Sequence, residues 1–564
     1  MTGTGPATLL IPSAVLVPDE LKLELGPIPT GMIPLHGKPA IEHIADSYEA
    51  ADDCPPTHKV IACGEQSQQI VEWTERSEYD WEVVDIGSTR SLGATVGQAL
   101  GTLGEDRLRG SLFVQFADTL VYPACAPAGE DSICYETADH PLRWTTFETG
   151  PDGRISSISE KFTVEGRKRT NTFVGQFQLQ DPIGYHEELT RALGGDTAAS
   201  GGLDPFYAAL LSYLDAGSYT LRQPDNWIDV GHLDTYYRAK TQFLNTREFN
   251  EMRIDEQRNI IRKESDDPDI LGPEIRWYDR LPKELKPFTP QVFDYSLGQP
   301  TTVDLEYIGY PTLSDIYLYG DHGIHIWKGI FRSLFETLDA FAEHSTGDHS
   351  AMADAQSAIY YDKTVNRLER LADDEQFEPF FDRSTVTING TEYEGLDVML
   401  SSLRSDLNAL GLLDPVTPTV IHGDLCFANI LYDVRTSLLK LIDPRGSFGT
   451  YDVYGDSRYD LAKLLHSVDG NYEFIINDRF DVTAEPQAGR IEYTKYTDQT
   501  HDQRRDLFLS MLESHYPEEI DRLWGIESLL WLSMVPLHAD EPERQFTMLA
   551  QGIEKYNRVF GETI

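Results

Sequence analysis

The sequence predicts two domains: an α/β domain with a mixed, mainly parallel sheet over residues 1–245, and an α+β domain over residues 246–564. Three observations support this prediction. The 564 residues exceed what a single hydrophobic core usually serves. Short apolar runs alternate with helical patterns up to about Leu221, which is typical of a parallel sheet covered by helices. From Phe249 onward this alternation gives way to a strand pair followed by long helical segments.

The first domain should begin with a buried strand at Leu9–Val17. This apolar stretch is too short to cross a bilayer, and no basic segment of a signal peptide precedes it. Further strands are expected at Lys59–Cys63, Trp81–Ile86 and Ser111–Phe116, and helices at Ala40–Ala50, Gln66–Glu75 and Tyr236–Glu248. Ligands of such sheets bind beyond the carboxyl ends of the strands, so polar residues there are candidates for function.

The second domain should open with a strand pair and continue mainly as helices. The strands are expected at Phe249–Ile254 and Asn259–Lys263, joined by a polar turn. A mostly helical pattern runs from Gly329 to about Leu413, and helices are expected again from Tyr459. Between them, short apolar strands at Val420–Ile421, Ile430–Leu431 and Leu438–Ile442 surround polar motifs.

The composition limits the partners. The 93 acidic residues outnumber the 47 basic ones, and the formal charge of −46 repels nucleic acid and anionic membrane surfaces. We therefore expect neither a nucleic-acid partner nor membrane insertion. The spread of acidic residues suits a halophilic cytoplasm, or else an ordinary acidic cytosolic protein. Five cysteines without a CxxC pattern suggest neither a disulfide framework nor a zinc site, and fit a reducing cytoplasm.

The strongest chemical signal lies between residues 421 and 446. His422-Gly423-Asp424 precedes Asn429 by the spacing of a kinase catalytic loop, and Asp443 ends the following strand. Phosphoryl transfer needs a carboxylate beside the attacking hydroxyl and oxygen ligands that hold Mg²⁺ on the phosphates. This segment could supply both. The alternative is a loop in which Asp and Asn only cap turns.

The same segment resembles the aminoglycoside and choline kinases. The resemblance implies a protein-kinase-like fold with an N-lobe at about 246–312 and a C-lobe at about 313–564. It also implies that Asp424 is the catalytic base, that Asn429 and Asp443 are Mg²⁺ ligands, and that ATP is the phosphoryl donor. Asp460 and Lys463, in a segment that resembles the family's G-D-P-x-Y-D-L-A motif, would stabilise the loop or line the acceptor site.

Upstream residues follow the same family order. Lys263 ends a predicted strand and would contact the phosphates of ATP, with Glu274 as its helical partner. Glu306 lies in a segment, 304–308, that resembles the adenine-binding hinge. The turn at 255–258 lacks the glycines of a phosphate-covering loop, so how the β- and γ-phosphates are covered stays open.

The first domain resembles the sugar-1-phosphate nucleotidyltransferases. The matching segments are Ile33–His43, Phe116–Leu120, Ser159–Lys161, Asn171–Phe177 and Trp227–His232. The resemblance implies a Rossmann-like fold in which Asp118 and Asp229 hold Mg²⁺. Lys161 would contact the acceptor phosphate, Gly175 lies on the sugar-contacting strand, and CTP or UTP would be the nucleotide. The family's glycine-rich loop would fall near Pro12–Val17, but its glycines and arginine are missing.

The order of the two domains resembles fused nucleotidyltransferase–kinase proteins of surface-polysaccharide loci. That implies polysaccharide biosynthesis, in which a small alcohol or sugar is phosphorylated and then bound or activated by the first domain. Two alternatives stay open: a kinase with a degenerate, non-catalytic nucleotide-sugar-binding module, and a non-catalytic scaffold. The residues indicate neither the identity of the acceptor nor the oligomeric state.

Overall fold

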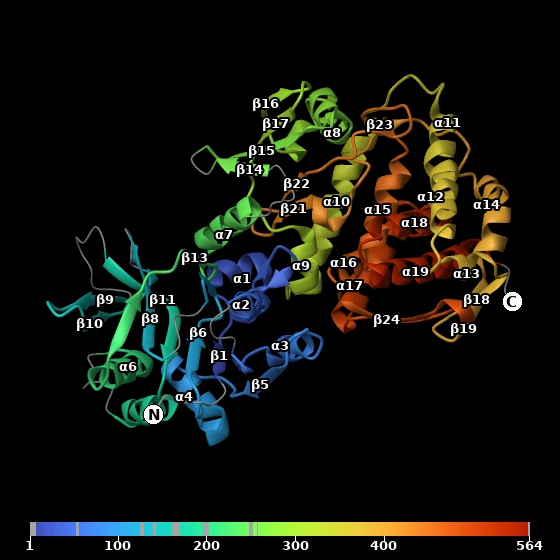
Figure 1. Cartoon of the computed structure of the whole chain (residues 1–564). Coiled ribbons are helices and arrows are strands. Elements are labelled where there is room, and N and C mark those ends of the chain that lie inside the picture. The colour runs from blue at the N-terminus through green and yellow to red at the C-terminus, as the bar shows by residue number, and fades with distance from the viewer. Residues whose placement is uncertain are drawn as a thin grey trace. The chain divides into compact units, whose positions relative to one another are not determined.

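The computed structural model describes residues 7–51, 56–124, 129–138, 143–160, 170–195, 202–246, 252–255 and 258–561. The chain forms two compact units (Figure 1). The N-terminal unit comprises Met1–Phe243 and Tyr319–Asp321, and the C-terminal unit comprises Leu244–Leu318 and His322–Ile564. Within the described ranges, no helix is both long and apolar enough to cross a membrane.

The N-terminal unit is built on a nine-stranded sheet. Its centre consists of four parallel strands in the order β6–β1–β4–β5, namely β6 (Leu112–Gln115), β1 (Thr8–Ser13), β4 (His58–Cys63) and β5 (Trp81–Asp85). Leu9, Leu10 and Ile11 of β1 are fully buried. A strand buried on both faces needs a continuous apolar run, which is why the sequence predicted this part of the sheet. The α/β class of the unit is confirmed.

The rest of this sheet is mostly antiparallel and was not predicted in detail. Strand β11 (Thr170–Leu179) runs antiparallel to β6, to β8 (Asp131–Ala138) and to β9 (Thr146–Thr149). At the edges, β10 (Ile155–Ser159) pairs with β9, and β12 (Tyr219–Arg222) pairs in parallel with β8. A separate pair joins β7 (Thr119–Tyr122) to β13 (Asn226–Asp229).

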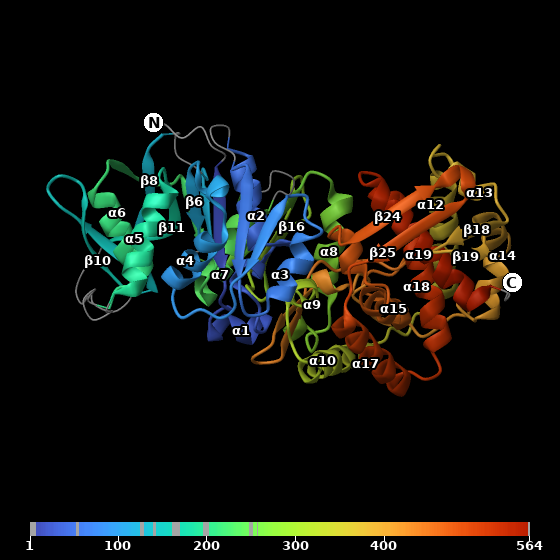
Figure 2. The ribbon, with the colours of Figure 1, turned by 90° about the horizontal axis from the view of Figure 1, so that it is seen from below.

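Seven α-helices accompany these strands in the described part of the unit. They are α1 (Asp19–Leu25), α2 (Ala40–Glu49), α3 (Ser67–Thr74), α4 (Leu92–Thr102), α5 (Pro182–Gly194), α6 (Pro205–Asp215) and α7 (Leu233–Thr246). Leu100 of α4, Leu189 of α5 and Leu210 of α6 share one buried core with the strands (Figure 2). Asp204 links two of these helices, because its carboxylate accepts from the backbone N–H groups of Phe206 at 2.9 Å and Gly93 at 2.8 Å.

The C-terminal unit begins with an antiparallel sheet in the order β14–β15–β17–β16. The strands are β14 (Met252–Asp255), β15 (Ile260–Ser265), β16 (Val292–Ser296) and β17 (Thr301–Glu306). Helix α8 (Pro268–Arg280) packs on this sheet and starts at a capping residue, Asp267, whose side chain accepts from Asp269 N. Strands β14 and β15 match the predicted strand pair, although 247–251 lie outside the described residues.

Helices make up most of the remainder. They are α9 (Leu313–Tyr319), α10 (Ile324–Ala342), α11 (Met352–Gln356), a π-helical turn (Ser357–Asp362), α12 (Lys363–Ala372), α13 (Glu378–Phe381), α14 (Leu396–Ala409), α15 (Ser457–Val468), α16 (Tyr472–Ile476), α17 (Gln499–His515), α18 (Ile520–Met534) and α19 (Pro542–Phe560). Two short pairs, β20 (Thr419–Val420) with β23 (Tyr454–Gly455) and β21 (Ile430–Asp433) with β22 (Leu438–Leu441), frame the loop at 421–429. Every residue of α15 from Arg458 to Val468 is buried.

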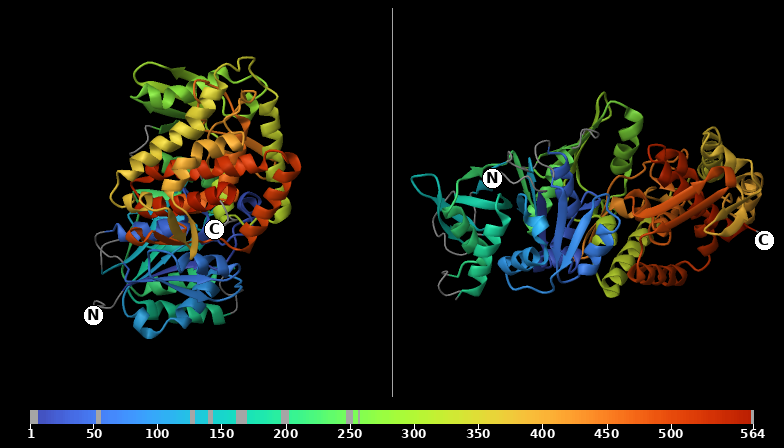
Figure 3. Two further views of the ribbon diagram at one scale, coloured as in Figure 1. Left: turned by 90° about the vertical axis from the view of Figure 1, so that its right-hand side faces the viewer. Right: turned by 60° about the horizontal axis from the view of Figure 1, so that its bottom comes forward.

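A second four-stranded sheet corrects the helical prediction for two segments. Strands β18 (Thr385–Ile388) and β19 (Thr391–Glu394) interrupt the helices before residue 413. Strands β24 (Phe480–Glu485) and β25 (Arg490–Lys495) interrupt those after Tyr459, and α19 packs against them (Figures 2 and 3). The turn at Asn389-Gly390, with φ of 48° and 77°, is a hairpin signal that the helical reading overlooked.

Candidate active sites

The predicted catalytic loop brings Asp424, Asn429 and Asp443 into one place. Asn429 ends a short 3₁₀ turn, Phe427–Asn429, and its Nδ2 donates to Asp424 O at 2.8 Å and to Asp424 Oδ2 at 3.2 Å. The hairpin of β21 and β22 pairs Ile430 with Leu441, and Ile442 N donates to Asn429 O at 3.0 Å. This register sets Asp443 beside Asn429.

Lys263 joins this group from the N-terminal sheet of the unit. Its ammonium lies 2.8 Å from Glu274 Oε1 and also pairs with Asp443 Oδ1. Burial alone would lower the pKa of Lys263, but the carboxylates of Asp443 and Glu274 raise it above its usual value. Lys263 therefore keeps its positive charge. It lies where β15, α8 and the segment after β22 meet. Asp443 itself adopts a left-handed backbone with φ of 55°, a strained conformation that clusters at functional sites.

Helix α15 fixes the loop from behind. Asp460 accepts from the backbone N–H groups of His422 at 2.7 Å and Gly423 at 2.8 Å. Lys463, one turn further on, pairs with Asp424 Oδ1 at 2.8 Å. Burial raises the pKa of Asp460 to about 7, although its two N–H donors act in the opposite direction. The structure therefore brings both residues to the loop, as the resemblance implied.

The protonation states around the loop follow from these contacts. Burial would raise the pKa of Asp424, but the charge of Lys463 holds it below its usual value. Asp424 is therefore an ionised carboxylate, and its side chain is 43% exposed. Burial lowers the pKa of His422 to about 4, so this ring is neutral; its Nε2 lies 2.9 Å from Ile442 O. His422 holds the loop together, and Asp424 is the group open to a reactant.

Glu306 is not brought into this group. In the β15–β17 register it faces Ile260, three positions and roughly 10 Å along the strand from the pair that contains Lys263. Its N–H donates to Gln291 O at 2.8 Å, and its Oε2 accepts from Gln291 N at 3.2 Å. Glu306 borders a cavity of about 1010 Å³ that Phe293 and Lys440 also line. A contact with adenine through this segment stays a prediction.

The N-terminal unit holds a second candidate site, a cavity of about 400 Å³. Asp118, Asp229 and Gly175 all line it, so the structure brings together three of the four residues predicted there. The other lining residues are Leu92, Phe116, Thr119, Arg143, Trp144, Thr145, Glu160, Phe173, Val174, Asp204, Tyr207, Trp227 and His232. The fourth predicted residue, Lys161, lies outside the described residues.

Strand pairing explains how the two aspartates meet. Asp118 immediately precedes β7, and the antiparallel register of β7 and β13 pairs Thr119 with Asp229. Val230 N donates to Asp118 O at 2.9 Å, which holds the ends of the two strands together. Asp118 and Asp229 are more than a hundred positions apart in the sequence, yet both line the same cavity, as the resemblance implied.

Asp229 already has several donors. Its Oδ1 accepts from Gly231 N at 2.7 Å and from Thr235 Oγ1 at 3.3 Å. Its Oδ2 accepts from Trp144 Nε1 at 2.5 Å and lies 3.5 Å from His232 Nδ1. A carboxylate offers about four lone-pair positions, and three of them are used by these hydrogen bonds. Metal binding by Asp229 would require Trp144 or His232 to move, and its role as a ligand stays a prediction.

The segment that would carry the family's glycine-rich loop is tied into the protein. Ser13 Oγ accepts from Gly31 N at 2.9 Å. Backbone hydrogen bonds link Thr30 N to Val15 O at 3.2 Å and Val17 N to Ile28 O at 2.9 Å. These contacts bind residues 13–17 to residues 28–31. A triphosphate cradle needs backbone N–H groups that converge on the anion. The N–H group of Val17 is not available for this, because it donates to Ile28 O.

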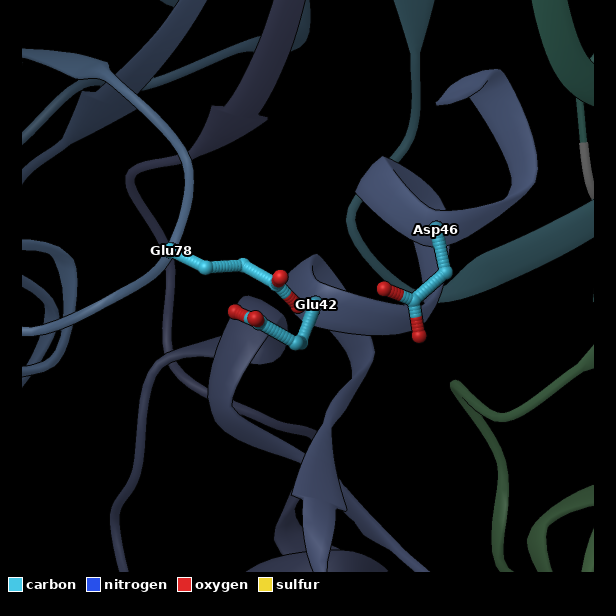
Figure 4. Close-up of side chains that lie close together, drawn as sticks. All are labelled: Glu42, Asp46 and Glu78. Atoms are coloured by element: carbon cyan, nitrogen blue, oxygen red, sulfur yellow. The ribbon is translucent and has the colours of Figure 1, made fainter. Parts of the chain in front are cut away.

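An acidic group that sequence reasoning missed lies on α2. Glu42 and Asp46 stand one helical turn apart, and Glu78 approaches them from the loop after α3 (Figure 4). Trp73 Nε1 donates to Glu42 at 2.9 Å, and Tyr79 OH donates to Asp46 at 2.7 Å. The spacing of Glu42 and Asp46 by four residues was the available signal. These donors make the group part of a polar network between α2 and α3.

Comparison with known proteins covers mainly the N-terminal region. No protein-family model matches the chain. The N-terminal region resembles the bifunctional protein GlmU of Methanococcus maripaludis strain S2, at 24% identity over 221 residues, or 38% of this chain. The chain spans about half, 50%, of the length of this relative.

Two solved structures are similar at low identity. A nucleoside-diphosphate-sugar pyrophosphorylase from Vibrio cholerae RC9 has 16% identity and a TM-score of 0.33, over 41% of this chain and 99% of that one. A putative glucose-1-phosphate thymidylyltransferase from Bacillus anthracis, in complex with a sucrose, has 14% identity and a TM-score of 0.33, over 43% and 98%.

Gly175 gives a direct test of the packing around the N-terminal cavity. It has φ of 86°, and an added Cβ would lie 2.7 Å from Phe116 Cδ2 and 2.9 Å from Thr119 Cγ2. We expect Gly175→Ala to lower the free energy of unfolding by about 2–5 kcal/mol, the sum of backbone strain and overpacking. Denaturant unfolding at high salt measures this change.

Gly153→Ala is the matched control. Gly153 also has a positive φ, 78°, but no atom lies within 4 Å of an added Cβ. This variant should lose only the backbone share, about 1–2 kcal/mol. If both variants lost the same free energy of unfolding, the close contact between Gly175 and Phe116 would contribute nothing to stability.

Proposed function

We propose that the C-terminal unit transfers the γ-phosphoryl group of ATP to a hydroxyl of a small sugar or alcohol. The observation that carries this proposal is the convergence of Asp424, Asn429, Asp443 and the Lys263–Glu274 pair from separate segments. A loop that only capped turns would not need a partly buried lysine from another sheet. The proposed domain extends over 246–564, with an N-lobe at about 246–312.

Each residue has a role that follows from its contacts. Asp424 accepts the proton of the attacking hydroxyl, because Lys463 keeps it ionised while its side chain stays 43% exposed. As the new P–O bond forms, the bond between the γ-phosphorus and the bridging oxygen breaks and ADP leaves. Bound Mg²⁺ would neutralise the charge that develops on the phosphates.

The metal ligands and the phosphate contact come from the remaining residues. Asn429 turns its Nδ2 toward Asp424, so its Oδ1 faces away and can coordinate Mg²⁺ together with Asp443. Lys263 would exchange its contact with Asp443 for the phosphates of ATP once the metal neutralises that carboxylate. Glu274 holds the lysine in place during the exchange.

For the N-terminal unit we propose a nucleotidyltransferase-like role on the phosphorylated product. The similarity to GlmU and the cavity with Asp118, Gly175 and Asp229 support this role. In the catalytic form of the proposal, the acceptor phosphate would attack the α-phosphorus of CTP or UTP, release pyrophosphate and form an activated sugar or alcohol.

A binding module is the second candidate for this unit. Two observations favour it. The carboxylate of Asp229 already accepts three hydrogen bonds, and segment 13–17 is tied to residues 28–31 in the place of a glycine-rich loop. In this form the unit would hold the nucleotide-activated product without forming it.

Asp424→Asn tests the kinase proposal. The amide cannot accept the hydroxyl proton, so acceptor-dependent formation of ADP should fall by on the order of 10²–10⁴-fold. The measurement is ADP release in a panel of sugars and alcohols with ATP and Mg²⁺ at molar KCl. Asp414→Asn, which removes one exposed charge from the same unit, should keep the wild-type rate. Undiminished turnover in Asp424→Asn would refute the assignment of the base.

Asp118→Ala tests the nucleotidyltransferase proposal. If Asp118 holds the metal beside the leaving group, release of pyrophosphate should fall by 10²-fold or more, on the order of one lost charge contact in a transition state. Pyrophosphate is measured with each NTP and a set of sugar phosphates. Asp225→Ala, in an exposed turn of the same unit, is the control. A wild-type protein that binds nucleotide sugars but releases no pyrophosphate would favour the binding module.

A further inference from the structure

Three cations gather around one tyrosine beside the catalytic loop. Lys363 Nζ lies 3.2 Å from Tyr459 OH, and Arg445 Nη1 donates to the same oxygen at 3.0 Å. Both cationic groups also lie over the ring, at 5.2 Å and 5.7 Å from its centroid. Arg367 stands one turn after Lys363 on α12, so it lies on the same face of the helix.

This cluster is adjacent to Asp424. Arg445 follows Asp443 by two residues, and its N–H donates to His422 O at 3.0 Å. An added Cβ on Gly423, which has φ of 81°, would lie 2.9 Å from Arg445 Cβ, so glycine allows this close approach. Tyr459 precedes Lys463, the partner of Asp424, by one helical turn. The cations therefore border the proposed base on the side of α12 and α15.

The three cations have no carboxylate partner in the part of the chain that the structure describes. This is unusual in a protein with 93 acidic and 47 basic residues. Elsewhere in the same unit, buried Arg458 pairs with Asp456, and buried Lys555 pairs with Asp469 and Glu527. Asp424 acts on Arg445 only at a distance, and like charges held together without a carboxylate ion pair cost free energy that an anionic ligand would recover.

The local electrostatics are strongly positive. Burial lowers the pKa of Lys363 to about 8, and the charges of Arg445 and Arg367 act in the same direction. Burial would raise the pKa of Tyr459, but Lys363 and Arg445 lower it to about 8. Both groups thus sit in a strongly positive environment while Lys363 and Arg367 remain partly exposed.

The surrounding structure holds the cluster in place. The π-helical turn Ser357–Asp362 comes directly before Lys363, and such turns recur at functional sites. Within it, Tyr360 OH donates to Asp456 Oδ2 at 2.9 Å and stacks on Tyr459. Arg367 Nη1 donates to Ser533 O at 2.9 Å. The cations are thus positioned by the fold before any ligand arrives.

We infer that Lys363, Arg367 and Arg445 bind a phosphate or carboxylate group of the acceptor whose hydroxyl is phosphorylated. This rests on the proposed kinase function and narrows its substrate to an anionic alcohol, such as a sugar phosphate or a hydroxy acid. An amino alcohol would place its ammonium against three cations. In the reaction the acceptor oxygen forms a bond to the γ-phosphorus, its proton passes to Asp424, and ADP departs, so the anchoring anion is unchanged.

The experiment compares acceptors that differ only in charge, with ATP, Mg²⁺ and the full-length protein. Neutral sugars, the matching sugar phosphates, the matching sugar acids and amino alcohols form the panel. We expect kcat/KM to be highest for an anionic acceptor; the phosphate and acid arms identify which anion the site takes. Preference for a neutral or amino acceptor would overturn the inference.

Charge removal tests the residues themselves. Lys363→Gln and Arg445→Gln should each raise the KM of the anionic acceptor by about 10- to 100-fold, as expected for one lost charge-assisted contact. The KM of ATP should not change. Lys328→Gln, which removes an exposed cation from α10, should change neither constant. A rise in the KM of ATP with an unchanged acceptor KM would assign the cluster to the nucleotide and overturn the inference.

Direct binding separates this inference from the kinase proposal. Calorimetric titration of the preferred sugar phosphate or sugar acid into the protein without ATP should give binding that is weakened in Lys363→Gln. Binding of this kind without any ADP formation would refute the kinase and retain the anion site. ADP formation without anion binding would retain the kinase and refute the site. Unchanged unfolding midpoints show that the variants are folded.

Discussion

The C-terminal site depends on one buried carboxylate, that of Asp460. It accepts from two successive backbone N–H groups of the loop, those of His422 and Gly423, and so fixes where Asp424 starts. The residue is fully inside α15, where an unpaired charge would be costly. Because the two N–H groups lose their only described acceptor if Asp460 is displaced, the loop and the helix must form together. The start of the loop, and with it the position of Asp424, follows from this pairing.

The remaining charged groups of the site hold one another in place through ion pairs. Lys463 pairs with Asp424, and the single charge of Lys263 is shared between Glu274 and Asp443. In the proposed reaction, Asp424 would take up a proton and Asp443 would bind a metal. Partly exposed pairs of this kind add little to stability, because solvent screens their attraction and desolvation of the lysine offsets part of it. Their value in this unit is that they define the geometry of the loop before the reactants bind.

Residue patterns predicted what is local, the family resemblances brought distant residues such as Lys263 and Asp443 together, and contacts that had neither signal were missed. The spacing of Asp424 and Asn429 lies within one loop, and the central strands of the first sheet are continuous apolar runs, so both could be read directly. Strand β11 has Thr, Asn and Gln among its residues, and the partners that bury them come from β6 and β8. Lys363 and Arg367 lie on a helix, where cations are usually solvated, and only the fold brings them to Tyr459. The hydrogen bond from Trp144 to Asp229 could not be foreseen from the sequence, and the role of Asp229 as a metal ligand stays a prediction.

The cations around the loop at 421–429 offset locally the negative charge of the whole chain. A protein with formal charge −46 repels phosphates at long range, and salt screens that repulsion beyond about 10 Å or less. An anionic reactant therefore has to be recognised at contact distance by fixed positive groups. Lys263 is such a group on the side of the metal ligands, and Lys363 with Arg445 is such a group on the side of Tyr459. In the proposed reaction, Lys363 and Arg445 would hold the substituents of the acceptor, Lys263 would hold the phosphoryl donor, and Asp424 would meet the hydroxyl.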